Sequence, residues 1–205
     1  MEKSRFNFIF RKRGELGIIF FLPALVAFCL SRPLWNPSGL LNFLIDAAGW
    51  LCWVCYVLFR LWATLYIGGQ KDVQLQTQGP YSIVRNPLYL GSFFLGLSFA
   101  FFLKSFILLV ITCIVSLIYS KRVVKIEETF LERKFGDDFR AYRRRTPRFL
   151  PDFRLYHADD FIPVELTALK CEARRLLASA LIPLGAQVLM WLRTNPGLPH
   201  PFLLP

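Results

Sequence analysis

The sequence predicts an all-α protein, a polytopic transmembrane helical bundle of about five spans. Of its 205 residues, 55% are hydrophobic and 16% aromatic, and mean hydropathy is +0.42. Soluble domains rarely reach these values. Long apolar runs separated by short polar segments point the same way. The net charge of +11 could indicate a nucleic-acid partner. However, a basic excess collected in loops between apolar spans is typical of membrane proteins, so no nucleic acid is expected.

The apolar runs define the expected spans. They cover residues 16–30, 40–67, 88–103, 106–119 and 177–192. A signal peptide is the rival interpretation of the first run, but Cys29 to Pro33 offers a poor small-residue cleavage site. The last run could instead be an interfacial helix. We expect one integral membrane domain over 1–205, made of an N-terminal arm and first span (1–39), a core (40–151) and a C-terminal extension (152–205).

The basic residues predict the orientation of the bundle. With a cytoplasmic N-terminus and five spans, 21 of the 25 Lys and Arg lie on the cytoplasmic side, and only Arg32, Lys104 and Arg193 on the other. This asymmetry favours a multi-pass protein with its N-terminus in the cytoplasm. It also places the 68–87 loop and the 120–151 segment on the same, cytoplasmic face.

The stretch from Gly79 to Gly91 is polar and turn-prone between two apolar regions. Asn86 suits a helix N-cap and Pro87 the first helical position. Free backbone N–H groups and the positive dipole end of such a helix can bind a carboxylate or a phosphate. A plain connector between two spans is an equally good interpretation of the turn residues alone.

The returning helix is expected to continue beyond the membrane from Ser120, with Gly136 as its stop and a short basic helix after it. It carries the adjacent pair Glu127 and Glu128. A solvated helix surface is the ordinary interpretation of such a pair. The alternative is a site for a cationic ligand, since a carboxylate attracts a cation most where solvent is scarce.

Other polar residues in the spans can be explained by purely structural roles. Cys52 and Cys55 form a C-x-x-C within a span, but without a second ligand pair they are expected to pack rather than to bind metal. Asp46 could lie at the interface and Arg60 could extend its head to water. Both could also be functional, because ionisable groups in a span are costly.

The combined pattern resembles a family. Gly79-Pro-Tyr-x-x-x-Arg-Asn-Pro-x-Tyr-x-Gly91, then Glu127-Glu128, then Phe135-Gly136-x-x-Phe139-x-x-Tyr142 and Pro147-Arg148-x-x-Pro151, is similar to the membrane methyltransferases. These include isoprenylcysteine carboxyl methyltransferase and the phospholipid N-methyltransferases. The resemblance covers roughly residues 40–151. It implies S-adenosyl-L-methionine as cofactor, without the soluble dinucleotide-binding fold.

The resemblance also implies site residues. For the cofactor these are Val73, Gln74, Leu75, Gln76, Tyr81, Asn86, Pro87, Leu88, Tyr89, Glu127 and Glu128. Arg122 and Arg85 are the implied catalytic residues, with Arg122 orienting an acceptor carboxylate. Family members usually have His where this chain has Asn86, which can form hydrogen bonds but cannot titrate near neutral pH. No metal site is implied.

The implied reaction is methyl transfer to a lipophilic or membrane-associated acceptor in the lipid bilayer. Isoprenylcysteine-type carboxyl O-methylation is the favoured reaction. Amine or phospholipid N-methylation and thiol S-methylation are the alternatives. A non-catalytic interaction protein on the same scaffold is the alternative from another class. Cofactor binding separates the two classes.

Overall fold

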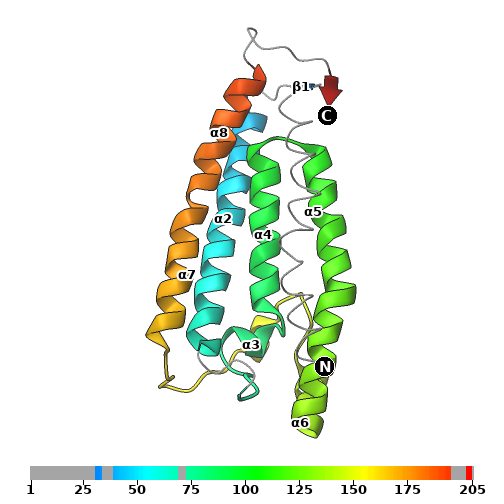
Figure 1. Ribbon diagram of the computed structural model, residues 1–205, viewed down its shortest axis with the longest axis vertical. Coiled ribbons are helices and arrows are strands. Elements are labelled where there is room, and N and C mark those ends of the chain that lie inside the picture. The colour runs from blue at the N-terminus through cyan, green and yellow to red at the C-terminus, as the bar shows by residue number, and fades with distance from the viewer. Residues whose placement is uncertain (1–30, 34–38, 69–72, 195–201, 205) are drawn as a thin grey trace, which may run out of the picture.

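A computed structural model of the chain describes residues 31–33, 39–68, 73–194 and 202–204. The described part is almost entirely helical, which confirms the predicted fold class. Its long helices run side by side as a bundle (Figure 1). Two three-residue strands, β1 (Ser31–Pro33) and β2 (Phe202–Leu204), pair in parallel. The predicted arm and first span (1–30) lie outside the described residues.

Three helices follow the predicted apolar runs 40–67, 88–103 and 106–119 closely, whereas the predicted run 177–192 begins in one helix and continues in the next. In chain order the helices are α2 (Gly39–Ile67), α3 (Pro80–Ile83), α4 (Pro87–Phe102), α5 (Phe106–Tyr119), the π-helical turn η1 (Ser120–Val124), α6 (Lys125–Arg145), the 3₁₀ turn η2 (Phe153–Leu155), α7 (Leu166–Ser179) and α8 (Leu181–Thr194). Pro87 begins α4, as expected from its fixed φ angle. Asn86 occupies the N-cap position, but its side chain makes no capping hydrogen bond.

Three helical segments of the described chain are long and apolar enough to cross a membrane: Gly39–Ile67, Phe106–Arg145 and Leu166–Leu192. Pro87–Phe102 is a shorter apolar helix. The protein is therefore a membrane protein with a polytopic helical architecture. The predicted helix stop at Gly136 is confirmed, because the backbone there is non-helical, with φ 53° and ψ −121°. Gly136 divides α6 at a kink, and the short basic helix expected after it runs to Arg145.

Small residues allow the helices to approach closely. A Cβ at Gly96 of α4 would lie 2.6 Å from Cγ2 of Thr112 in α5, so glycine is needed where these helices meet. A Cβ at Gly49 of α2 would lie 3.0 Å from the Phe102 ring of α4. The Lys104–Ser105 turn between α4 and α5 makes them an antiparallel hairpin. These contacts fix α4 between α2 and α5.

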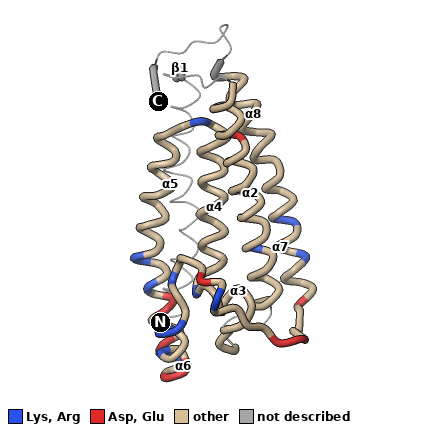
Figure 2. Tube along the Cα trace, turned by 180° about the vertical axis from the view of Figure 1, so that it is seen from behind, with Lys and Arg blue, Asp and Glu red and all other residues tan. Residues whose placement is uncertain are grey.

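Charged residues are unevenly distributed along the bundle. Most lie toward the end where α3 and α6 are found (Figure 2). At the opposite end, Lys104 Nζ lies 3.2 Å from Asp46 Oδ1. The loop that contains α3 and the α6 extension therefore share one end of the molecule, as the sequence indicated.

Candidate functional site

The loop around α3 is fixed by a buried glycine turn and by hydrogen bonds. Gly79 has φ 57°, a conformation that side chains other than glycine's disfavour. A Cβ there would also lie 2.3 Å from Cζ of Tyr66, so the Tyr66 ring packs directly on the glycine. The Tyr142 hydroxyl of α6 donates a hydrogen bond of 2.7 Å to the carbonyl of Tyr81. The loop is thereby tied to both α2 and α6.

A pocket of about 90 Å³ lies between this loop, the start of α4 and α6. Eleven residues proposed from the sequence line it. These are Gln74, Leu75, Gln76, Tyr81, Arg85, Asn86, Pro87, Leu88, Tyr89, Glu127 and Glu128. The structure thus brings together residues from two segments about forty positions apart in the sequence.

Two of the proposed residues do not line this pocket. Val73 is 74% exposed and lines a second, more open hollow of about 460 Å³. The two cavities share Gln74, Leu75 and Tyr142 in their walls. Arg122 is exposed on η1 and lines neither cavity. A π-helical turn holds more residues than an α-helical one, so η1 changes the helix phase between Arg122 and the glutamates.

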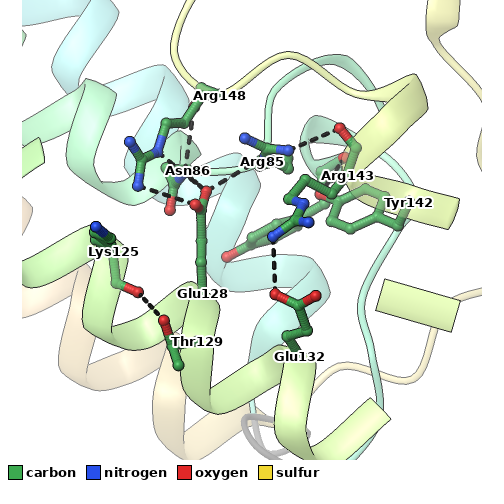
Figure 3. Close-up of polar contacts among 10 residues, drawn as sticks. Arg85, Asn86, Lys125, Glu128, Thr129, Glu132, Tyr142, Arg143 and Arg148 are labelled. Atoms are coloured by element: carbon green, nitrogen blue, oxygen red, sulfur yellow. Dashed lines mark hydrogen bonds and ion pairs between the residues drawn. The ribbon is translucent and has the colours of Figure 1, made fainter. Parts of the chain in front are cut away.

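The two glutamates have different partners. Glu127 Oε2 accepts a hydrogen bond of 2.8 Å from the Tyr89 hydroxyl, which joins α6 to the first turn of α4. Glu128 faces two arginines, with Arg148 Nη2 at 2.9 Å and Arg85 Nε at 3.4 Å (Figure 3). Its side chain is 13% exposed. Glu128 therefore balances the charge of a sheltered arginine pair.

Asn86 belongs to the network around Glu128. Its Nδ2 donates to the Arg148 carbonyl at 3.2 Å and lies 3.4 Å from Glu128 Oε1. Arg85 Nη1 also donates to the carbonyl of Arg143 at 2.8 Å. Burial lowers the pKa of the Arg85 guanidinium, and the charge of Glu128 opposes that change. These contacts tie the 85–86 turn to the end of α6 and to the segment after it.

The Tyr81 hydroxyl is a buried polar group of the pocket wall. Tyr81 is 6% exposed, and its Oη is a buried atom for which the described residues supply no hydrogen-bond partner. Burial raises the pKa of this phenol, the charge of Glu127 adds to the rise, and Arg60 opposes it. Burying a hydroxyl without a partner is unfavourable. The pocket therefore holds a polar group that a ligand could satisfy.

Reasoning from the sequence missed several residues of the site. Ile67, Leu131, Phe139 and Tyr142 complete the pocket wall, and Arg148 pairs with Glu128. Phe139, Tyr142 and Arg148 belong to the motif positions that carried the family resemblance, which was the available signal. Ile67 and Leu131 fit ordinary apolar helix stripes and gave no separate signal.

The core of the chain is similar in sequence to a known protein family. The sequence profile described as "Phospholipid methyltransferase" matches residues 42–138. Residues 42–138 are therefore similar to the phospholipid methyltransferase family. This confirms the family resemblance noted in the sequence. The family match begins near the start of α2, continues through α5 and η1 into α6, and ends before Tyr142, Arg148 and α7.

Three curated relatives of this chain have different names. The chain is 29% identical over 153 residues to the nickel-cobalt-cadmium resistance protein NccN of Alcaligenes xylosoxydans xylosoxydans, covering 75% of this chain and 71% of the relative. It is 33% identical over 134 residues to the cobalt-zinc-cadmium resistance protein CzcN of Cupriavidus metallidurans, covering 64% and 58%. It is 30% identical over 130 residues to the protein-S-isoprenylcysteine O-methyltransferase of Schizosaccharomyces pombe, covering 56% and 54%. No solved structure matches the chain.

The resistance names raise the question of a metal site. Among the residues that the structure describes, no group of three or more His, Cys, Asp and Glu is placed to hold a metal ion. Cys52, Cys55, Cys113 and Cys171 have free thiols. The acidic residues of the pocket instead contact arginine, tyrosine and asparagine.

Proposed function

We propose that this protein transfers a methyl group from S-adenosyl-L-methionine to a lipophilic or membrane-associated acceptor. The observation that carries the proposal is the pocket where the start of α4 meets α6. Its wall combines Glu127, the Tyr89 hydroxyl and the unpartnered Tyr81 hydroxyl with apolar side chains. The family of residues 42–138 supports the same class of reaction.

The hydrogen-bonding and charged groups of the pocket suit this cofactor. Glu127 could accept hydrogen bonds from ribose hydroxyls or from the ammonium group, and its charge favours a bound sulfonium. Tyr81 could donate to the cofactor, which would remove the cost of its buried hydroxyl. Ligand pockets usually measure roughly 300–1,000 Å³, so we expect the cofactor to extend from the 90 Å³ pocket into the adjoining hollow of 460 Å³.

The bound cofactor would supply a methyl group that is already activated. The residues of the chain then need only to hold it in line with the acceptor and to exclude water. This assigns Arg85 a positioning role, because its guanidinium contacts Glu128 and the Arg143 carbonyl. Asn86 would serve as a hydrogen-bonding group and not as a proton carrier.

The acceptor class is part of the proposal. Carboxyl O-methylation of the isoprenylcysteine type has support from the relative of that name. Its other support was Arg122 as the partner of an acceptor carboxylate, and Arg122 lies outside both cavities. N-methylation and S-methylation are therefore tested alongside carboxyl O-methylation, and none of the three is preferred. A role in metal resistance, suggested by the names of two relatives, would act through methylation of a membrane component.

We further propose that the pocket opens on the cytoplasmic side, in agreement with the clustering of basic residues at that end (Figure 2). A soluble cofactor could then enter from the water phase and a lipophilic acceptor from the bilayer.

Calorimetric titration of the purified protein in detergent with S-adenosyl-L-methionine tests the function. We expect saturable binding by the wild type. Transfer of labelled methyl groups to a prenylcysteine, an amine-headgroup lipid and a lipophilic thiol then distinguishes the acceptors. Absence of cofactor binding would favour the non-catalytic scaffold.

A further inference from the structure

The C-terminal extension is joined to the core by a buried ion pair. Arg60 of α2 and Glu172 of α7 meet in two contacts, Nε to Oε1 at 2.6 Å and Nη2 to Oε2 at 2.8 Å. The Glu172 side chain is 4% exposed and the Arg60 side chain 18%. The sequence allowed Arg60 to extend toward water, but the structure pairs it inside the bundle. The helices concerned lie next to each other along the bundle (Figure 1).

The Arg60 side chain also packs on the helix that begins at the pocket. A Cβ at Gly91 of α4 would lie 2.9 Å from Cγ and 3.2 Å from Cδ of Arg60. Gly91 lies about one helical turn after Pro87 and Leu88, which line the pocket. The position of Arg60 therefore bears directly on the first turns of α4. Its charge also acts on the Tyr81 phenol.

The polypeptide between α6 and α7 lies against the α3 loop. The Asp152 amide donates to the Ile83 carbonyl at 3.0 Å, and the Gly79 amide donates to the His157 carbonyl at 2.9 Å. The His157 amide donates to Ser82 Oγ at 3.2 Å. These bonds hold the loop on both sides of Tyr81. The segment beyond the family match therefore reaches the site at two places.

We propose that Glu172 is a positioning residue of the pocket, which fixes Arg60 against the start of α4 and thereby sets the geometry of the pocket wall. Its role in ligand binding rests on the proposed function. The extension beyond residue 151 then contributes to the geometry of the site. Glu172 does not line the pocket, so it acts through Arg60; its other partner, Arg175 at 3.3 Å, lies on the same helix as Glu172.

The test uses the double variant Arg60→Met, Glu172→Leu in the full chain. Replacing both members of a buried ion pair by apolar residues of similar volume is often neutral for stability, so the variant keeps its fold. We expect the dissociation constant for S-adenosyl-L-methionine to rise about fivefold, within the range for coupling through packed side chains. Hydrogen exchange of amides in residues 79–91 should rise without ligand, while that of 106–119 stays unchanged.

The control is the double variant Asp46→Leu, Lys104→Met, which removes the ion pair at the opposite end of the bundle. It should leave cofactor binding and exchange in residues 79–91 as in the wild type. If the first variant does not fold, Glu172→Gln is measured in the same way. A folded variant with unchanged affinity and unchanged exchange refutes the positioning role. If the wild type binds no cofactor, the proposed function fails, and the exchange measurement alone decides the role of Glu172.

Discussion

The Tyr89 hydroxyl donates a hydrogen bond of 2.8 Å to Glu127 and so connects the first turn of α4 to α6 across the pocket. The neighbouring carboxylate of Glu128 points to Arg148 and Arg85 instead. Adjacent helical residues differ in direction by about 100°, which separates the two environments. This division between a pocket carboxylate and an arginine-paired carboxylate leads to the first prediction.

Glu127→Gln should weaken binding of S-adenosyl-L-methionine by about tenfold, which corresponds to about 1.4 kcal/mol. The substitution keeps the shape of the side chain and removes the charge that favours a sulfonium or ammonium group. Glu128→Gln should instead lower the free energy of unfolding by about 1–3 kcal/mol, because Arg85 and Arg148 lose their anion. Calorimetric titration and thermal unfolding measure the two effects, and the opposite pattern would exchange the assigned roles.

Tyr81→Phe and Tyr142→Phe form a matched pair. Each removes one buried hydroxyl, but only that of Tyr142 has a protein partner, the Tyr81 carbonyl. Tyr142→Phe should therefore cost about 1–3 kcal/mol of stability. Tyr81→Phe should leave stability equal or higher, because no protein partner is lost, and should weaken cofactor binding if the hydroxyl donates to the cofactor as proposed. Equal cofactor affinity in Tyr81→Phe and the wild type would exclude that contact.

Gly79→Ala and Gly136→Ala compare two glycines with nearly the same backbone conformation. Their φ and ψ angles are 57° and −126° for Gly79, and 53° and −121° for Gly136. A Cβ at Gly136 meets nothing within 4 Å, whereas one at Gly79 meets the Tyr66 ring at 2.3 Å. Backbone strain is common to both variants. Gly79→Ala should therefore be less stable than Gly136→Ala by about 1–3 kcal/mol, the usual cost of overpacking.

Thiol labelling tests the proposed arrangement in the membrane. We choose Val73→Cys and Asp137→Cys at the loop end and Leu40→Cys at the start of α2, in a chain whose own cysteines are replaced. Val73 is 74% exposed, the Asp137 side chain 95% and Leu40 72%. A membrane-impermeant reagent should label positions 73 and 137 from the cytoplasmic side and position 40 from the other. Labelling of 73 and 137 from opposite sides is incompatible with a shared site.

The sequence by itself determined the helices, the membrane class and the meeting of two polar segments. These features depend on local properties: the length of apolar runs, the backbone restriction at Asn86 and Pro87, and the distribution of Lys and Arg. The local properties also indicated the loop before α4 and the pair Glu127 and Glu128 as possible binding elements. The family resemblance then implied the individual cofactor residues, from Gln74 to Tyr89 and on α6.

Only the tertiary structure decided how individual side chains are used. A regular helical period cannot foresee the π-helical turn η1, which separates Arg122 in direction from Glu127 and Glu128. The partner of Arg60 lies 112 residues away, on a helix that the family pattern does not cover. Tertiary packing decides which residues so distant in sequence form a pair. A buried charge is costly unless an opposite charge lies beside it, and only the fold determines which opposite charge that is.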